Sequence, residues 1–189
     1  MDHQYFEKNN FFAEDFQTSS SAPAEFVECT FTGIDFSACN MSQFKFYDCT
    51  FTECNFSNVS LRCATFRSPV FKKSKLIGLN WSEAATLTGA TFSDSILDYC
   101  IFHSLNLKAT TFSDCKMHEV DFYEAKLMKS SFSGCTLKGA SFNKANLTDV
   151  DFRNATEYFI DVRDSIVTGA KFNLPEALTL LSSLKITIE

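Results

Sequence analysis

Glycine is scarce in this sequence, with 6 residues among 189, and no stretch has the glycine-rich spacing of a loop that cradles phosphate groups. Long apolar runs are also absent, because none approaches the roughly 18 residues that a membrane-spanning helix needs. The N-terminal residues lack both the basic and the apolar region of a secretory leader. These absences predict a cytoplasmic protein with no phosphate loop and no membrane contact.

The cysteines and histidines do not form the patterns of a metal or catalytic site. None of the 8 cysteines belongs to a C-x-x-C pair with a partner histidine, as a zinc site requires. His3, His103 and His118 fall on different faces of the repeat described below or outside it, and we expect no nucleophile or carboxylate beside them. The prediction is a protein that is not an enzyme and has no cofactor, metal or small-molecule substrate.

Phenylalanine, by contrast, is abundant, with 22 residues against 1 tryptophan, and it recurs with a fixed period. Between Met117 and Leu147 a large apolar residue occupies every fifth position, and a small residue precedes it by two. A period of five fits neither an α-helix, with about 3.6 residues per turn, nor a strand, with about 2. Such short-period repetition indicates a solenoid of stacked coils.

Most cysteines share the small inward position of this period, where a free thiol acts as a small apolar side chain. Cys63 alone is expected to point outward, as a candidate reactive surface thiol. The inward set is Cys29, Cys39, Cys49, Cys54, Cys100, Cys115 and Cys135.

The pattern resembles that of the pentapeptide-repeat family, which is a small residue, a polar residue, leucine or phenylalanine, and two further polar residues. Residues 145–149 read Ala-Asn-Leu-Thr-Asp, and residues 150–154 read Val-Asp-Phe-Arg-Asn. The resemblance covers about nine tenths of the chain. It implies an all-β fold, a right-handed quadrilateral parallel β-helix with four pentapeptides per coil.

A four-sided coil places residues that are 20 apart in one column, and the sequence supports such columns. One column contains only phenylalanine, at positions 11, 31, 51, 71, 92, 112, 132, 152 and 172. The step from Phe71 to Phe92 is one residue too long, so we expect residues 82–86 to bulge outward without skipping a face. The predicted organisation is an irregular N-terminal cap over residues 1–25, the β-helix over residues 26–172, and a helix with a short strand over residues 173–189.

The final segment carries the signals of a short capping helix. Asn173 is a suitable N-cap, Pro175 suits the first turn, and Glu176 suits the positive end of the helix dipole. The segment has more apolar residues than one coil end needs to cover, which favours a two-fold dimer interface over a simple cap. The predicted interface residues are Leu178, Leu181, Leu184, Ile186 and Ile188, the two isoleucines alternating like a short closing strand.

Residues 151–172, followed by this helix and strand, resemble the Qnr-type proteins of the pentapeptide-repeat family. The resemblance implies a DNA-like outline, a homodimer through the C-terminal ends, and binding to DNA gyrase or topoisomerase IV that counters quinolones or related poisons. The chain lacks the long loop insertion of several Qnr-type members. The alternative function is a non-catalytic scaffold or immunity module with another protein partner, or a structural rod.

Charge limits how far DNA mimicry extends. The net charge of -6 and the pI of about 5.1 argue against a direct nucleic-acid or membrane binder. Duplex DNA carries about one charge per 1.7 Å, more than the net charge per coil, so mimicry is expected on one face only. The face beneath the column Phe102, Phe122, Phe142 and Val162 has the largest excess of acids, opposed by Lys144 and Arg163. The candidate partner-binding residues, named the acidic stripe, are Glu83, Asp121, Glu124, Asp161 and Asp164.

Two interpretations stay open for each charged surface. The acidic stripe binds a partner, or it only keeps a phenylalanine-rich rod soluble. A basic coil spreads cations over successive faces, either as ordinary solvated surface or as a contact for a partner. Its residues are Arg62, Arg67, Lys72, Lys73 and Lys75.

Overall fold

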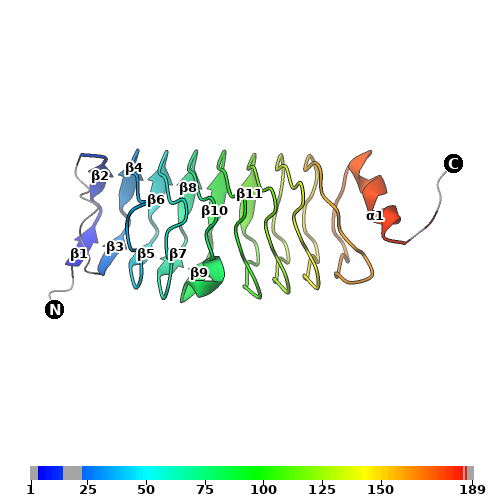
Figure 1. Cartoon of the computed structure of the whole chain (residues 1–189), viewed down its shortest axis with the longest axis horizontal. Helices are drawn as coiled ribbons and strands as arrows, with labels where there is room; N and C mark the ends of the chain where they lie inside the picture. The colour runs from blue at the N-terminus through cyan, green and yellow to red at the C-terminus, as the bar shows by residue number, and fades with distance from the viewer. Residues whose placement is uncertain (1–3, 15–22, 185, 187–189) are drawn as a thin grey trace.

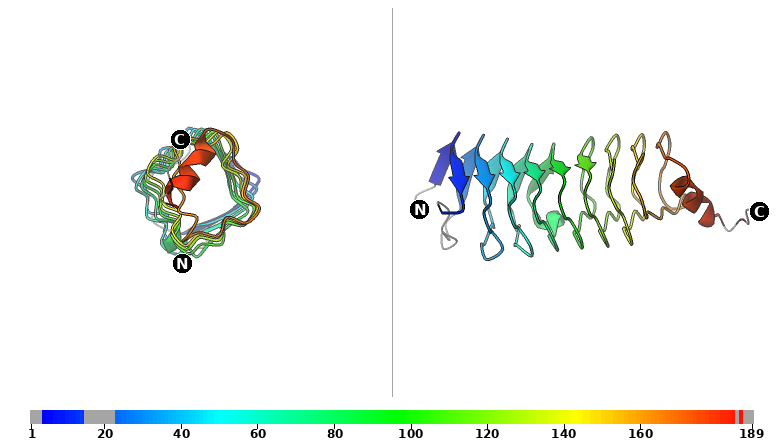
Figure 2. Two further views of the ribbon diagram at one scale, coloured as in Figure 1. Left: turned by 90° about the vertical axis from the view of Figure 1, so that its right-hand side faces the viewer. Right: turned by 90° about the horizontal axis from the view of Figure 1, so that it is seen from above.

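A computed structural model describes residues 4–14, 23–184 and 186 of the chain. It shows a rod of stacked coils that ends in a short helix at the C-terminal end (Figure 1). Viewed along the rod, the coils superimpose on a four-sided outline and the helix lies across the last coil (Figure 2). The predicted right-handed quadrilateral parallel β-helix is therefore confirmed.

Two faces of the N-terminal half contain regular strands. The strands are β1 (Gln4–Glu7), β2 (Asn10–Phe12), β3 (Ala24–Val27), β4 (Thr30–Thr32), β5 (Lys45–Tyr47), β6 (Thr50–Thr52), β7 (Thr65–Arg67), β8 (Val70–Lys72), β9 (Thr86–Thr88), β10 (Thr91–Ser93) and β11 (Thr111–Ser113). They form two parallel sheets with the orders β1-β3-β5-β7-β9 and β11-β10-β8-β6-β4-β2. Isolated parallel bridges join the remaining faces and continue the stack, as between Asp121 and Ser141.

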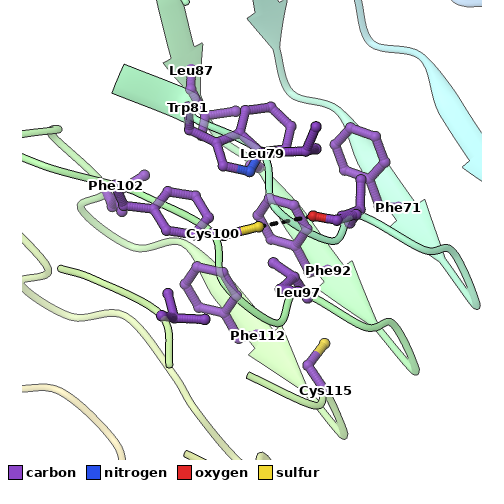
Figure 3. Close-up of a cluster of buried hydrophobic side chains, with 14 of the residues drawn as sticks. Phe71, Leu79, Trp81, Leu87, Phe92, Leu97, Cys100, Phe102, Phe112 and Cys115 are labelled. Atoms are coloured by element: carbon purple, nitrogen blue, oxygen red, sulfur yellow. Dashed lines mark hydrogen bonds between the residues drawn. The ribbon is translucent and has the colours of Figure 1, made fainter. Parts of the chain in front are cut away.

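The phenylalanine column forms one continuous interior ladder, as predicted. Its eight successive ring pairs are stacked, with centroids 4.9–5.2 Å apart and planes at most 13° from parallel. A second ladder, from Trp81 through Phe102 and Phe122 to Phe142, meets it edge to face. Figure 3 shows the part of the two ladders around Trp81, Phe92, Phe102 and Phe112. Both arrangements are the favoured aromatic geometries, and burial of these rings supplies most of the stability.

The one-residue insertion is absorbed at a corner. A 3-10 turn, η1 (Trp81–Glu83), begins at Asn80, whose side chain accepts a hydrogen bond from the Ser82 N–H. Strands β8 and β10 on either side still pair Phe71 with Phe92, with their rings 5.2 Å apart. The inward column therefore passes the insertion without a change of face.

The first coil is more regular than the predicted irregular cap. Strand β1 pairs with β3 over its whole length, and β2 pairs with β4. Phe6 and Phe11 are only partly buried, and they stack on Phe26 and Phe31. Asn9 is exposed, although it occupies the position of the small inward residue of the repeat. The core is therefore thinner in this coil, because polar side chains stand where later coils have small ones. The division of the chain at residues 26 and 173 stays a prediction.

The repeat is disturbed after Phe152, because Glu157 stands five residues further on, where the pattern calls for a large inward side chain. Glu157 is exposed in a left-handed conformation with φ of 59°, and Tyr158 is buried in its place. The Tyr158 ring lies 5.6 Å from that of Phe152 and 5.8 Å from that of Phe172. Burial raises the pKa of Tyr158 to about 12. A bulky ring thus preserves the interior where the repeat supplies a carboxylate.

The C-terminal helix begins later than the sequence predicts. A 3-10 turn, η2 (Glu176–Leu178), precedes the four-residue α1 (Thr179–Ser182). Asn173 is not the N-cap, since that position belongs to Pro175, which makes no side-chain cap bond. Instead the Asn173 carbonyl accepts the Ala177 N–H at 3.0 Å. The predicted strand at Ile186 and Ile188 falls mainly outside the described residues.

The cysteines lie where the repeat predicts. Six are buried, Cys39 is half-buried and Cys63 is exposed, and all eight are free. Burial raises the pKa of Cys49 and Cys100 to about 12 and that of Cys54 to about 11. Because the thiolate is the reactive form, these interior thiols are inert at neutral pH.

Thiol labelling of the native protein at pH 8 should therefore modify one residue rapidly, Cys63, because it alone is exposed. Full denaturation should release all eight thiols. Kinetics with a chromogenic disulfide reagent measure both phases, and Cys63→Ser should remove the rapid phase alone. Rapid labelling of several thiols in the native protein would contradict the burial of the inward column.

Candidate functional site

The acidic stripe follows one long face of the rod, at two repeat positions. Glu83, Glu124 and Asp164 come two residues after an inward large side chain, whereas Asp121 and Asp161 come one residue before it. The stack is held by main-chain pairing, for example the bridge from Asp121 to Ser141. The structure brings Glu124 and Asp164 together through Lys144. Among the described residues the bridges do not continue from Ser141 to Asp161, and Ile160 rather than Val162 is fully buried in that coil. The register of the stripe therefore changes at its C-terminal end.

Nearly every acid of the stripe has a local partner. Asp161 accepts hydrogen bonds from Arg163 Nε at 2.9 Å and Nη2 at 2.6 Å. Glu124 Oε1 lies 3.9 Å from Lys144 Nζ, and the Lys144 N–H donates to Asp164 Oδ2 at 3.0 Å. All these side chains are substantially exposed, so each ion pair contributes little to stability. Its main effect is to lower the net negative charge that a partner meets.

The titration behaviour of the stripe follows from these contacts. Hydrogen bonds from Arg163 lower the pKa of the Asp161 carboxyl to about 2, so this acid stays ionised in all ordinary buffers. A hydrogen bond to the Tyr123 hydroxyl, at 2.9 Å, raises the pKa of Lys144. The Lys144 ammonium also lies 5.1 Å from the centroid of the Tyr123 ring, within cation–π range. Asp161 and Lys144 therefore both stay charged across neutral pH.

The expectation that no histidine meets a carboxylate is wrong for His103. Its Nε2 lies 2.7 Å from Asp121 Oδ2, although the two residues are 18 apart in sequence. The contact arises because one coil returns the chain to the same face a single strand spacing away. Asp121 Oδ1 also accepts the Tyr123 N–H at 2.9 Å. The pair joins two successive coils at the surface of the stripe.

Glu83 lies apart from the other acids, on the η1 turn. Its Oε1 accepts a hydrogen bond from Asn80 Nδ2 at 3.1 Å, and its carbonyl accepts the Cys63 N–H at 2.9 Å. Arg62, a cation of the basic coil, precedes Cys63 on this face. The end of the stripe near Glu83 is consequently the less acidic end.

The basic coil is exposed on every face it reaches. Arg62, Arg67, Lys72, Lys73 and Lys75 are all solvent-accessible. Within the described parts of the chain, no ion pair joins any of them to an acid. The Arg67 guanidinium instead lies 5.4 Å from the centroid of the Tyr47 ring. These cations are free to interact with solvent or with a partner.

The C-terminal end combines a cap with exposed apolar groups. Leu180 packs against the core, and the Ser183 hydroxyl accepts the Val162 N–H at 3.4 Å, so the helix covers the last coil. Of the predicted interface residues, Leu178, Leu184 and Ile186 are about half exposed, at 47%, 45% and 53%. Leu181 is half-buried. Ile188 lies outside the described residues, and the dimer stays a prediction.

Sequence reasoning missed one surface feature, the apolar patch formed by Ile96, Tyr99 and Ile101. Tyr99 is 61% exposed, and the two isoleucines are half-buried. The signal was present in the columns, because Asn55 and Lys75 precede Ile96 at its repeat position and Asn80 precedes Ile101. Apolar residues therefore replace polar ones at two neighbouring outward positions of one coil.

Two kinds of site do not occur in the described residues. No three histidine, cysteine or acidic side chains there converge closely enough to hold a metal ion. In the same parts of the chain, no helix has both the length and the apolar character needed to cross a bilayer.

Comparison with known families identifies the repeat. The family described as pentapeptide repeat region matches residues 24–102, 71–144 and 105–179, which overlap to cover most of the chain. This protein belongs to the pentapeptide-repeat family. No curated protein matches its sequence.

Solved pentapeptide-repeat structures share the fold at low sequence identity. A trypsin-treated form of QnrB1, a plasmid-mediated fluoroquinolone resistance protein, matches 98% of this chain and 99% of its own, with 19% identity and a TM-score of 0.50. HetL, a pentapeptide repeat protein involved in heterocyst differentiation regulation from the cyanobacterium Nostoc sp. strain PCC 7120, matches 89% of this chain and 87% of its own. Its identity is 16% and its TM-score 0.55. Both likenesses concern the fold of the rod.

Proposed function

We propose that this pentapeptide-repeat protein binds a type II topoisomerase, DNA gyrase or topoisomerase IV, in the cytoplasm and protects it from quinolones or related poisons. The observation that carries the proposal is the end-to-end match of the rod with a fluoroquinolone resistance protein, over 98% of this chain. The rod contributes a long, rigid, non-catalytic surface. The acidic stripe is the part of that surface suited to a basic, DNA-binding region of the enzyme.

The charge of the stripe defines how the protein would resemble DNA. A coil rises about 4.8 Å, over which duplex DNA presents roughly three negative charges. The stripe has five acids, with Lys144 and Arg163 on the same face, so its net charge is only -3 over several coils. Mimicry is therefore local. The proposed interface is a limited acidic contact on a rod of suitable width.

Assembly as a dimer would lengthen this contact. The exposed Leu178, Leu184 and Ile186 at the C-terminal end offer an apolar surface that a second copy would cover. An end-to-end dimer places two acidic stripes along one long rod. The C-terminal end of the stripe, at Asp161 and Asp164, would then lie nearest the centre of the assembly.

Reversing two charges of the stripe tests the function. The double variant Asp161→Lys/Asp164→Lys should abolish protection of gyrase supercoiling against a quinolone, since it turns the acidic end basic. Its fold should survive, because both side chains lie at the surface and their partners are the exposed Arg163 and one main-chain N–H of Lys144. Binding by the parent should weaken steeply as salt rises, as expected for a charged interface. Supercoiling assays at a fixed drug concentration measure the effect.

A matched control reverses two acids on another face. Asp94 and Asp114 are exposed and lie on successive coils after β10 and β11. Asp94→Lys/Asp114→Lys changes the net charge equally and should protect as well as the parent. If the stripe variant also protects fully, the stripe is only a solubilising surface.

A second candidate function is a scaffold that binds an unrelated protein. The local pairing of Asp161, Asp121 and Glu124 favours it, because compensated acids imitate DNA less well than free ones. The likeness to HetL also fits a regulatory contact with another protein. A parent protein that neither binds nor protects gyrase or topoisomerase IV would support this candidate.

A further inference from the structure

Tyr99 has an unusual backbone conformation for its side chain. Its φ is +63°, and among the described residues it is the only aromatic with positive φ. This corner position of other coils carries glycine or mainly small and polar residues such as Asn58 and Glu119. A bulky side chain in the left-handed region is disfavoured and indicates a functional or structural demand. Packing of the interior does not require the ring at this position, because Tyr99 is 61% exposed.

The backbone beneath Tyr99 is rigid and its flank is open. The Tyr99 N–H donates to the His118 carbonyl at 2.8 Å, which ties the corner to the next coil. On the other side lies Gly78, whose N–H donates to the Asp98 carbonyl at 2.9 Å and which has no side chain to cover the ring. The core below, with Leu97, Cys100 and Phe102, is fully buried (Figure 3). The ring therefore projects from a fixed support.

The apolar patch adjoins the acidic stripe. Ile101 is bridged to Asp121, the stripe residue one coil further along. Ile96 lies between Lys75 and Lys116, and Lys116 Nζ is 3.3 Å from Asp98 Oδ2. Lys75 has no ion-pair partner in the described residues. An apolar centre with a polar border of mixed charge is the anatomy of a protein interface.

We propose that Tyr99, with Ile96 and Ile101, forms the apolar anchor of a protein interface, and that the acidic stripe forms the charged part of the same interface. The occupant is a protein surface with a basic region opposite the stripe and an apolar hollow beside it for the tyrosine ring. This inference rests on the proposed function, in which that protein is the topoisomerase. Buried aromatic anchors commonly carry most of the binding energy of such contacts.

The anchor accounts for binding by a surface of modest charge. A net charge of -3 on the stripe face competes poorly with DNA by electrostatics alone. A tyrosine held on a rigid corner loses little conformational freedom on binding, so its burial adds affinity at low entropic cost. This contribution does not depend on counterions, which separates it from the contribution of the stripe.

The test measures equilibrium binding of the intact protein to gyrase holoenzyme at low and high salt. Tyr99→Ala should weaken binding by about thirtyfold, the range of an interface hot spot, by the same factor at both salt concentrations. Ile96→Asn/Ile101→Asn should act in the same direction and fold normally, because asparagine already occupies both positions in the stack, Asn55 two coils before Ile96 and Asn80 one coil before Ile101. The stripe variant Asp161→Lys/Asp164→Lys should instead flatten the salt dependence.

Tyr5→Ala is the matched control, since Tyr5 is 54% exposed on β1 at the N-terminal end of the rod, away from Tyr99 (Figure 1). It should bind like the parent. The anchor is refuted if Tyr99→Ala binds like the parent while the stripe variant fails, an outcome that leaves the proposed function intact. Absence of parent binding to gyrase and topoisomerase IV refutes both. A change in molecular mass of Tyr99→Ala assigns the patch to self-association and also refutes the anchor.

Discussion

Replacing Phe132 by alanine is expected to lower the free energy of unfolding by about 3–5 kcal/mol, the usual cost of a large-to-small change in a core. Phe132 is fully buried and stacks on Phe112 at 4.9 Å and on Phe152 at 5.1 Å. Its ring also meets Phe122 and Phe142 edge to face. Stacked coils cannot collapse around the cavity without breaking their register, so the full cost should appear. Denaturant unfolding under reducing conditions measures it.

Ser133→Ala is the control for this substitution, because Ser133 is the next residue along the same coil and points outward. A surface change of this kind should alter stability by no more than about 0.5 kcal/mol. A loss below about 1 kcal/mol for Phe132→Ala, outside the range for a buried ring, would show that the ladder does not carry the stability of the rod.

The double variant Leu178→Asp/Leu184→Asp is expected to convert a dimer into a monomer. Both leucines are about half exposed at the C-terminal end, and a second copy would bury them against apolar surface. Carboxylates placed there would have to lose their hydration without a partner, which costs several kcal/mol each. The cap itself should survive, because Leu180 and Ser183 make its contacts with the last coil. Light scattering should give twice the chain mass for the parent and one chain mass for the variant.

Phe12→Asp serves as the control for assembly, since Phe12 is 48% exposed on β2 at the other end of the rod. Its mass should equal that of the parent. A parent that already scatters as one chain of 21.3 kDa would reject the dimer. A monomeric Phe12→Asp variant would show that the dimer interface lies at the N-terminal end instead.

Much of this fold was predictable because the five-residue repeat sets both the local conformation of the chain and the contacts between residues that are 20 apart. Each coil places residues 20 apart in contact, so Phe112, Phe132 and Phe152 must stack whatever their outward neighbours are. The inward cysteines follow from the same register. Parallel pairing at a fixed spacing leaves no freedom to rearrange these columns.

Tertiary structure alone decided what the outward side chains do. Side-chain direction at the surface depends on neighbours one coil away, so the contact between His103 and Asp121 was not readable from spacing. The late start of α1 likewise depended on how Leu180 meets the last coil, because a four-residue helix is too short for its own capping signals to prevail. Tyr99 shows the division most clearly. Its column follows from the sequence, but its exposure depends on the neighbouring coil, where Gly78 has no side chain to cover the ring.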